Sequence, residues 1–265
     1  MFDAHTHLQD IRLKKILDRV LQRARADQIT GLCCCGTSPA DWHAVQDICE
    51  HHTTVALVIV AGFGVHPWYV EALPDDWKFA LEHFLENNPV ASIGEIGLDG
   101  IRKDVSRELQ RECFRYQLEL AVVHHRPVVL HGARAWGDLT ETLKPYADKI
   151  PALIAHGFSG SVEIMRSLIN MGAYLSFAGS VCNPSAVKAR AAAAQVPLGQ
   201  LLIETDAPDI FPAGGTPAAL DTHNRPLNQP SNLKYVCNTV AALRGVESDV
   251  IADITASNAR TAFLG

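Results

Sequence analysis

Six residues of types that commonly bind metal ions lie next to short apolar segments of this 265-residue chain. They lie at or just after the ends of five such segments and are His5, His7, Glu95, His131, His156 and Asp206. Imidazole and carboxylate ligands suit Zn²⁺, and Mn²⁺ and Mg²⁺ accept them too. A single catalytic metal usually takes three protein ligands, so six indicate two metals that share a bridging carboxylate. We predict that Glu95 is this bridge.

The competing interpretation is that these residues are ordinary polar residues that close strands. Any one histidine taken alone is more often an ordinary polar residue than a metal ligand. However, the spacing of His5 and His7 places both side chains on one face of an extended strand. Chance is a poor explanation for five separate strands that all end in ligand types, so the pattern favours a joint metal site.

The elements that position these ligands alternate along the chain. Apolar segments rich in Val, Ile, Leu or Cys predict strands buried on both faces, at Met1–Ala4, Ile29–Cys35, Val55–Ala61, Val90–Ile93, Pro127–Leu130, Ala152–Ala155, Ala173–Phe177 and Leu201–Ile203. Helices are predicted between and after them, at Ile11–Ala26, Pro39–His51, Asp75–Glu86, Ser106–Val123, Gly137–Ala147, Val162–Asn170, Ser185–Ala194, Asn232–Leu243 and Ser248–Leu264. Eight such units predict an α/β fold, the (β/α)₈ TIM barrel, with the metal site at the C-terminal face of the strands. A doubly wound open sheet is the alternative.

Composition narrows the class of protein. We expect one domain over residues 1–265, because no linker or low-complexity segment interrupts the pattern. With 23 Lys and Arg against 29 Asp and Glu, the net charge is −6, which excludes a basic nucleic-acid coat. Two divalent cations would offset four of these six charges. The sequence does not define an oligomeric state, and a monomer is compatible with it.

Cysteine content and hydropathy bear on the cellular compartment. Of the seven cysteines, Cys33, Cys34 and Cys35 are consecutive in an apolar run, and no C-x-x-C pair occurs. A buried strand explains them better than a zinc site does. We therefore expect free thiols in a reducing compartment, the cytoplasm, and no membrane association. No apolar run is long enough to span a membrane, and the N-terminal residues lack a signal-peptide pattern.

The chain resembles the TatD family of metal-dependent hydrolases, within the amidohydrolase-like superfamily. Six stretches carry the resemblance, in the family's order and over nearly the whole chain. They are residues 2–8 (FDAHTHL), 64–67 (GVHP), 93–99 (IGEIGLD), 156–161 (HGFSGS), 204–208 (ETDAP) and 257–260 (SNAR). Together these stretches are highly specific, although the H-T-H triplet alone would be weak.

The resemblance implies a TIM-barrel hydrolase of DNA phosphodiester bonds, a deoxyribonuclease of the 3′–5′ exonuclease kind that acts at a free end. It implies two divalent metal ions, Mg²⁺, Mn²⁺ or Zn²⁺. The ligand assignment that it implies is His5, His7 and Asp206 for one metal, and His131 and His156 for the other. Glu95 would bridge the two ions. The metals would activate a water molecule, and Asp206 would act as the general base that accepts its proton.

Further residues are predicted around the metals. His66 resembles a family position on the substrate side and is expected to contact phosphate rather than metal. Arg134 is a candidate phosphate clamp. Ser159 and Ser161 flank Gly160 just before a helix, where an N-cap is the first expectation and a phosphate contact the second. Asp99 is expected to orient a metal ligand, and Trp68 could stack on a base.

The sequence departs from the family at positions near the substrate. Gly100 follows Asp99 where the family usually has an aromatic residue, Arg134 is displaced by one position, and Gln229 stands in a stretch that is usually Asn-Glu-Pro. These changes leave the metal ligands intact and bear on the choice of substrate.

Two other function classes compete with a nuclease. The first is a metal-dependent deacylase, esterase or amidohydrolase that acts on another substrate, such as mischarged aminoacyl-tRNA. Against the cyclic amidohydrolases, which often bridge their metals with a carbamylated lysine, no lysine lies between Lys78 and Lys103. The second is a non-enzymatic metal-binding protein, which six intact ligands argue against.

Overall fold

Eight parallel strands form one closed sheet in the computed structural model, which describes all residues from Met1 to Gly265. They pair in chain order and are β1 (Phe2–Thr6), β2 (Gly31–Cys35), β3 (Val58–Phe63), β4 (Ser92–Asp99), β5 (Val128–Ala133), β6 (Leu153–Ala155), β7 (Tyr174–Phe177) and β8 (Leu201–Ile203). The sheet closes just after β8, where Ala207 forms a parallel bridge with Thr6. The prediction of a (β/α)₈ TIM barrel is confirmed.

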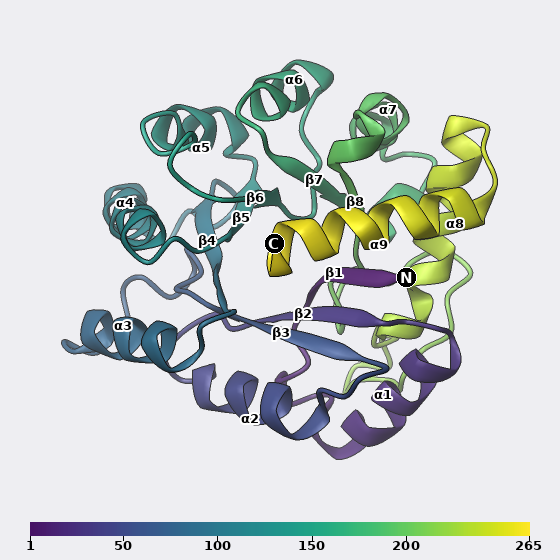
Figure 1. The fold of residues 1–265 in the computed structure, drawn as a ribbon, viewed down its shortest axis with the longest axis horizontal. Helices are drawn as coiled ribbons and strands as arrows, with labels where there is room; N and C mark the ends of the chain where they lie inside the picture. The colour runs from purple at the N-terminus through teal and green to yellow at the C-terminus, as the bar shows by residue number, and fades with distance from the viewer.

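Helices surround the barrel and also cover one of its ends (Figure 1). They are α1 (Leu17–Ala26), α2 (Trp42–His52), α3 (Trp77–Asn87), α4 (Arg107–Val123), α5 (Trp136–Leu143), α6 (Val162–Asn170), α7 (Val187–Gln195), α8 (Leu233–Arg244) and α9 (Ser248–Leu264). Short 3-10 turns occur at Lys14–Ile16, Gly179–Cys182, Leu198–Gln200 and Pro230–Asn232. All nine predicted helices are present, and most of their boundaries move by only a few residues.

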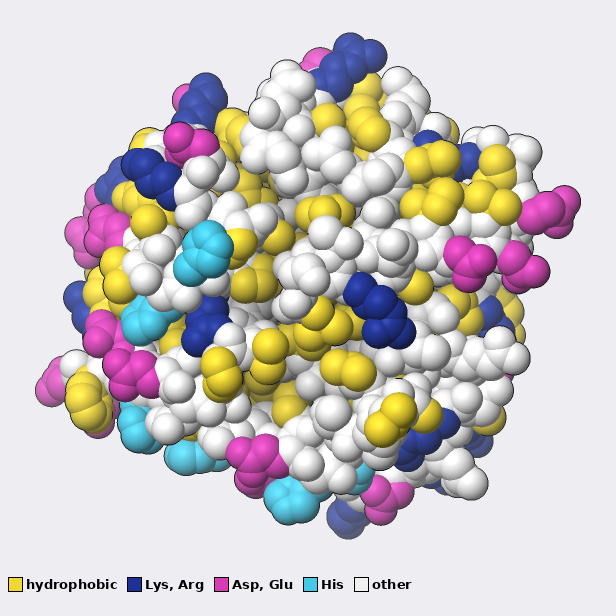
Figure 2. Space-filling model, viewed as in Figure 1, with side chains coloured by type: hydrophobic (Ala, Val, Ile, Leu, Met, Phe, Trp, Pro, Cys, Tyr) yellow, Lys and Arg dark blue, Asp and Glu magenta, His cyan; other side chains and the backbone are white.

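The interior of the barrel is packed, and α9 closes one of its ends. Phe2, Cys33, Cys35 and Leu202 belong to a cluster of buried side chains that is separate from the larger one between strands and helices. Phe263 of α9 stacks on Phe2, with ring centroids 5.8 Å apart. On this face the Lys and Arg side chains are scattered and form no continuous basic surface (Figure 2). Because α9 covers this end of the barrel, we look for the active site at the other end, where the strands have their C-termini.

Three strands, β1, β4 and β5, are longer than the sequence pattern predicts. The predicted fourth strand stops at Ile93, whereas β4 continues to Asp99 because it pairs with β5 through Gly97 and His131. The register between the two strands shifts after Ile93. Glu95 and His131 therefore lie inside strands, not after them, and the glycines that resemble a strand end are part of the ladder.

Gly97 is a position where the barrel admits only glycine. Its φ is +146°, and a Cβ there would collide with the backbone carbonyl oxygen of His131 on the neighbouring strand. We expect Gly97→Ala to lower the free energy of unfolding by about 3 kcal/mol, as measured by urea denaturation. Gly137→Ala is the matched control, because a Cβ added to this residue of α5 would have no atom within 4 Å. Equal losses in the two variants would contradict the steric explanation.

Candidate metal centre and active site

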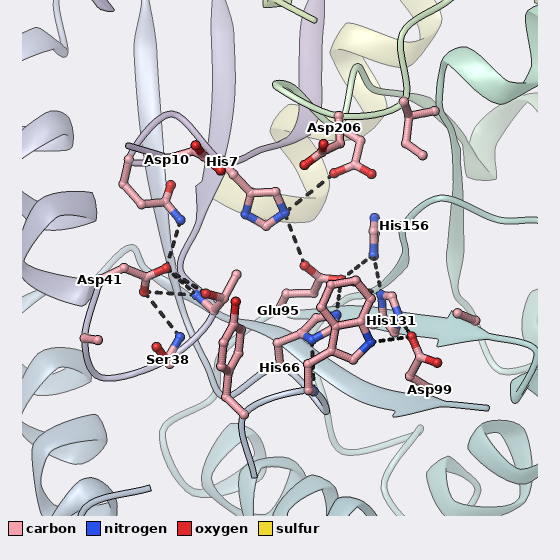
Figure 3. A pocket seen from close by; sticks show the side chains of 18 of the residues that line it. His7, Asp10, Ser38, Asp41, His66, Glu95, Asp99, His131, His156 and Asp206 are labelled. Carbon is pink, nitrogen blue, oxygen red and sulfur yellow. Dashed lines mark hydrogen bonds and ion pairs between the residues drawn. The ribbon is translucent and has the colours of Figure 1, made fainter. Parts of the chain in front are cut away.

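The first of two donor groups consists of His5, His7, Glu95 and Asp206, at the C-terminal end of the barrel. The Nε2 atoms of His5 and His7 lie 3.1 Å apart. They are 3.4 and 3.3 Å from Glu95 Oε2, and 3.7 and 3.6 Å from Asp206 Oδ1. Figure 3 shows His7 turned toward both carboxylates. Residues in or just after β1, in β4 and after β8 thus bring four donor atoms together.

These separations fit a divalent cation. Ligand bonds of about 2.0–2.2 Å place two ligands of a tetrahedral ion about 3.3–3.6 Å apart. The five distances in the first donor group run from 3.1 to 3.7 Å. Most of them are longer than ordinary hydrogen bonds. The four atoms therefore surround a space of the size that one ion fills.

The second donor group consists of Glu95, His131 and His156. Glu95 Oε1 lies 2.6 Å from both His131 Nδ1 and His156 Nε2, and the two nitrogens are 3.2 Å apart. The two shorter distances are hydrogen-bond lengths, so this group would open by roughly 0.8 Å to hold an ion. Each oxygen of Glu95 faces one donor group, which is the arrangement that a bridging carboxylate needs.

Two of the ligand histidines, His7 and His131, are hydrogen-bonded through the ring nitrogen that faces away from the donor groups, and in His156 this nitrogen faces a carboxylate without a hydrogen bond. The pairs are His7 Nδ1 with Cys35 O at 2.8 Å, His131 Nε2 with Asp99 Oδ2 at 3.2 Å, and His156 Nδ1 with Glu204 Oε1 at 3.4 Å. Such a partner keeps the proton on the outer nitrogen and leaves the inner lone pair free for a metal. Asp99 also accepts a hydrogen bond from Trp68 Nε1 at 2.7 Å, which fixes the carboxylate beside His131.

Burial and mutual charge set the protonation of the first donor group. Burial, together with His156, lowers the pKa of His5 to about 4. Burial also acts to lower the pKa of His7, but the hydrogen bond and charge of Glu95 and the charge of Asp206 raise it to about 9. Burial raises the pKa of the Asp206 carboxyl to about 7, partly opposed by His156 and His7. Metal binding must therefore displace protons from this group.

His66 presents a donor to the cavity, unlike the ligand histidines. Its Nδ1 accepts a hydrogen bond from the Trp68 backbone N–H at 3.1 Å, and its Nε2 lies 3.5 Å from Glu95 Oε1. A neutral imidazole whose Nδ1 accepts carries its proton on Nε2. Burial lowers the pKa of His66 well below its usual value, so the ring is neutral at pH 7. An inward N–H suits an oxygen of a substrate and not a metal ion.

Every donor residue except the fully buried His5 lines one cavity of about 700 Å³, a volume typical of small-molecule sites. Several exposed apolar side chains line it, namely Ile11, Trp68, Tyr69, Ile101 and Ile210. Arg12 is the single Lys or Arg side chain of the lining, against six acidic residues. Arg12 is thus the only permanently charged cation that the lining offers to a phosphate.

Comparison with known proteins decides the family. Residues 2–264 match the family model described as TatD related DNase. The chain belongs to this family. It is similar to the uncharacterized metal-dependent hydrolase YabD of Bacillus subtilis, with 30% identity over 264 residues that cover 99% of this chain and 98% of the relative. It is equally similar to the 3′–5′ ssDNA/RNA exonuclease TatD of Pantoea ananatis, with 30% identity and 99% of each chain covered.

The fold comparison agrees with the TatD assignment. The crystal structure of YJJV, a TatD homolog from Escherichia coli K12, superposes with a TM-score of 0.88 at 29% identity, over 100% of this chain and 98% of that one. The predicted resemblance to the TatD family is confirmed. The chain is therefore an enzyme of the metal-dependent hydrolase class.

Two of the predicted substrate contacts of this TatD protein lie outside the cavity. Arg134 follows directly after β5 with a φ of +48°, and its side chain is exposed. Ser159 is exposed too, and neither residue lines the cavity. Of the two predicted N-cap candidates, Ser161 caps α6, because its Oγ accepts the backbone N–H of Ile164 at 3.5 Å. The structure thus gives no support to substrate contact by Arg134 or Ser159, and both stay predictions.

Two buried carboxylates have structural roles at the TatD site that the sequence interpretation did not assign. Glu204 accepts the Gly157 backbone N–H at 2.6 Å and lies beside His156. Asp3 accepts the backbone N–H and the hydroxyl of Thr205, at 2.8 and 2.5 Å, and so ties β1 to the segment after β8. A charged residue in or next to an apolar strand segment could have indicated such a structural role, because charged residues are seldom buried without a partner.

Proposed function

We propose that this protein is a 3′–5′ exonuclease that hydrolyses single-stranded DNA or RNA. The observation that carries the proposal is the pair of donor groups that share Glu95 within a single cavity. The substrate class comes from the similarity to TatD exonucleases. A cavity of about 700 Å³ suits the terminal nucleotide of a flexible strand better than a wrapped duplex.

We assign two divalent ions, Mg²⁺, Mn²⁺ or Zn²⁺, to this cavity. The proposed ligands are His5, His7 and Asp206 for one ion and His131 and His156 for the other, with Glu95 between them. The spacing of the first donor group and the hydrogen-bonded outer nitrogens of His7 and His131 support this assignment. When bound, the two cations would neutralise charge on the phosphate and activate a water molecule.

The side chains of this chain would then orient the substrate and move a proton. His66 donates from Nε2 to a non-bridging oxygen of the scissile phosphate. Asp206 would accept the proton of the attacking water, because its Oδ1 faces His5 and His7 and its other oxygen is free for the transfer. Trp68 is exposed at the cavity, fixed by its bond to Asp99, and can stack on the terminal base.

The thiols, the helices and the donor residues bear on the cellular compartment and the oligomeric state of the protein. All seven cysteines are unpaired, which supports a reducing compartment such as the cytoplasm. No helix combines the length and the hydropathy that a membrane span requires. We propose that a monomer is sufficient for activity, because every side chain of both donor groups comes from one chain.

The direct test is hydrolysis of a 5′-labelled single-stranded oligonucleotide by metal-stripped protein, to which Mg²⁺, Mn²⁺ or Zn²⁺ is returned. We expect a ladder that shortens from the 3′ end and the release of mononucleotides, with none in the presence of a chelator. A phosphorothioate linkage at the 3′ terminus is the matched substrate control and should slow the reaction. If metal is bound but no nucleotide is released, the nuclease proposal fails. Release of an amino acid from aminoacyl-tRNA, with the RNA intact, would instead identify a deacylase.

A further inference from the structure

An arginine joins two loops at the cavity that holds the donor groups. Arg12 donates from Nε and Nη2 to the two oxygens of Asp10, at 2.9 and 2.7 Å. It also donates from Nη1 and Nη2 to the two oxygens of Asp209, at 2.9 and 2.7 Å. Two edges of the guanidinium are thus each matched by a carboxylate, in the fork geometry that phosphate oxygens also satisfy.

The backbone places this arginine close to the first donor group. Asp10 donates its backbone N–H to the carbonyl of His7 at 3.1 Å, and Asp209 donates its own to the carbonyl of Asp206 at 2.8 Å. Bonds of this i to i+3 kind close β-turns, which keep the terminal Cα atoms within about 7 Å. Each carboxylate that binds Arg12 is therefore one turn away from a proposed metal ligand. Figure 3 shows Asp10 and His7 side by side.

The two carboxylates hold Arg12 unequally. Asp10 also accepts the backbone N–H of Arg12 at 2.7 Å, and its side chain is only 23% exposed. The side chain of Asp209 is 56% exposed and makes no hydrogen bond except those from Arg12. An exposed ion pair changes an equilibrium constant by about five-fold at most. Asp209 is therefore the partner that an incoming anion can displace, while Asp10 keeps the guanidinium in place.

We propose that Arg12 binds a second phosphate of the nucleic acid, adjacent to the scissile one, and that Asp209 occupies this phosphate position in the free enzyme. The inference rests on the proposed nuclease function and adds to it a binding site for a phosphodiester outside the two-metal centre. It also makes Arg12 a specificity determinant, because a substrate with a single phosphodiester has no group for it. Strands with at least two phosphates gain this contact.

Binding measurements test the proposal without relying on turnover. The probe is a fluorescent oligothymidylate with phosphorothioate linkages, which resists hydrolysis, and anisotropy is recorded over a range of salt concentrations. Arg12→Gln should weaken binding roughly ten-fold, since a charge-assisted hydrogen-bond pair is lost. It should also reduce the slope of log K against log salt by about 0.7, the contribution of one phosphate on a single strand. An unchanged slope would overturn the proposal.

The carboxylate is tested by a double-mutant cycle. Asp209→Asn should tighten binding by about two- to five-fold, because Arg12 is no longer occupied. In the Arg12→Gln background, the same change should have no effect. Asp138→Asn is the matched control: Asp138 pairs with Arg107 and Arg111 at 2.8 and 3.0 Å, away from the cavity. Equal tightening by Asp209→Asn and Asp138→Asn would reveal a general charge effect and refute the proposal.

Substrates of two sizes separate this inference from the function on which it rests. For Arg12→Gln, the loss in kcat/KM should be several-fold larger on an oligonucleotide than on the p-nitrophenyl ester of thymidine 5′-phosphate, which has one phosphodiester. If the unmodified enzyme releases no nucleotide from the oligonucleotide, the nuclease function itself fails. If the unmodified enzyme does release nucleotides, but Arg12→Gln lowers kcat/KM by the same factor on both substrates, only the role of Arg12 is refuted.

Discussion

Replacement of Glu95 by Gln is expected to reduce nucleotide release about a thousand-fold and to impair binding of at least one metal ion. The carboxylate presents Oε2 to the first donor group and Oε1 to the second, so its charge serves both. The other carboxylate, Asp206, pairs only with the histidines of the first donor group, so Glu95 is the one side chain that faces both groups. Loss of several kcal/mol of charge stabilisation corresponds to about three powers of ten in rate. The measurements are single-turnover rates with Mn²⁺ and metal content by elemental analysis.

A graded control distinguishes this effect from general damage to a buried site. Glu204 is buried too and acts on His156 from outside the donor groups. Glu204→Gln should cost only about ten- to a hundred-fold in metal affinity or activity. Thermal unfolding of both metal-stripped variants checks that the barrel is intact. A Glu95→Gln variant that retains two ions and keeps its activity within ten-fold would refute the bridging role.

Replacement of Asp206 by Asn is expected to lower kcat by about a hundred- to ten-thousand-fold, the range for loss of a general base. The amide oxygen can still ligate an ion, so we expect metal content to change less than the rate. Burial raises the pKa of this carboxyl to about 7 in the metal-free protein. Its protonated fraction therefore grows as pH falls through that value, and bound cations shift this range to lower pH. The unmodified enzyme should lose activity on the acidic side, and the variant should lack that dependence.

The result for Asp206 is informative only together with metal analysis. Asp138→Asn makes the same chemical change at an exposed ion pair and should leave kcat unchanged. A variant of Asp206 with full metal content and normal kcat would show that another group accepts the proton. Loss of metal in parallel with activity would instead identify a ligand role without a base role.

The architecture and the ligand types follow from the sequence alone. Alternation of short apolar strands with amphipathic helices specifies βα units, and parallel strands place their C-terminal ends on one face. For this reason His5 and Asp206, which are some two hundred residues apart, could be expected at a common site. All eight strands and nine helices that the pattern predicts are present. Hydrophobic periodicity is a local property of the chain, so it can be recognised from the sequence without the structure.

The way in which the site is built from these residues depends on tertiary packing. Pairing with β5 extends β4 and places Glu95 inside a strand, where its two oxygens face different donor groups. The hydrogen bond from Trp68 turns the N–H of His66 into the cavity, although the residue type alone fits a metal ligand equally well. Arg12 binds Asp209, which lies 197 residues away in the sequence. Ring orientation, proton position and pairing over such distances are set by contacts between elements, which spacing along the chain does not specify.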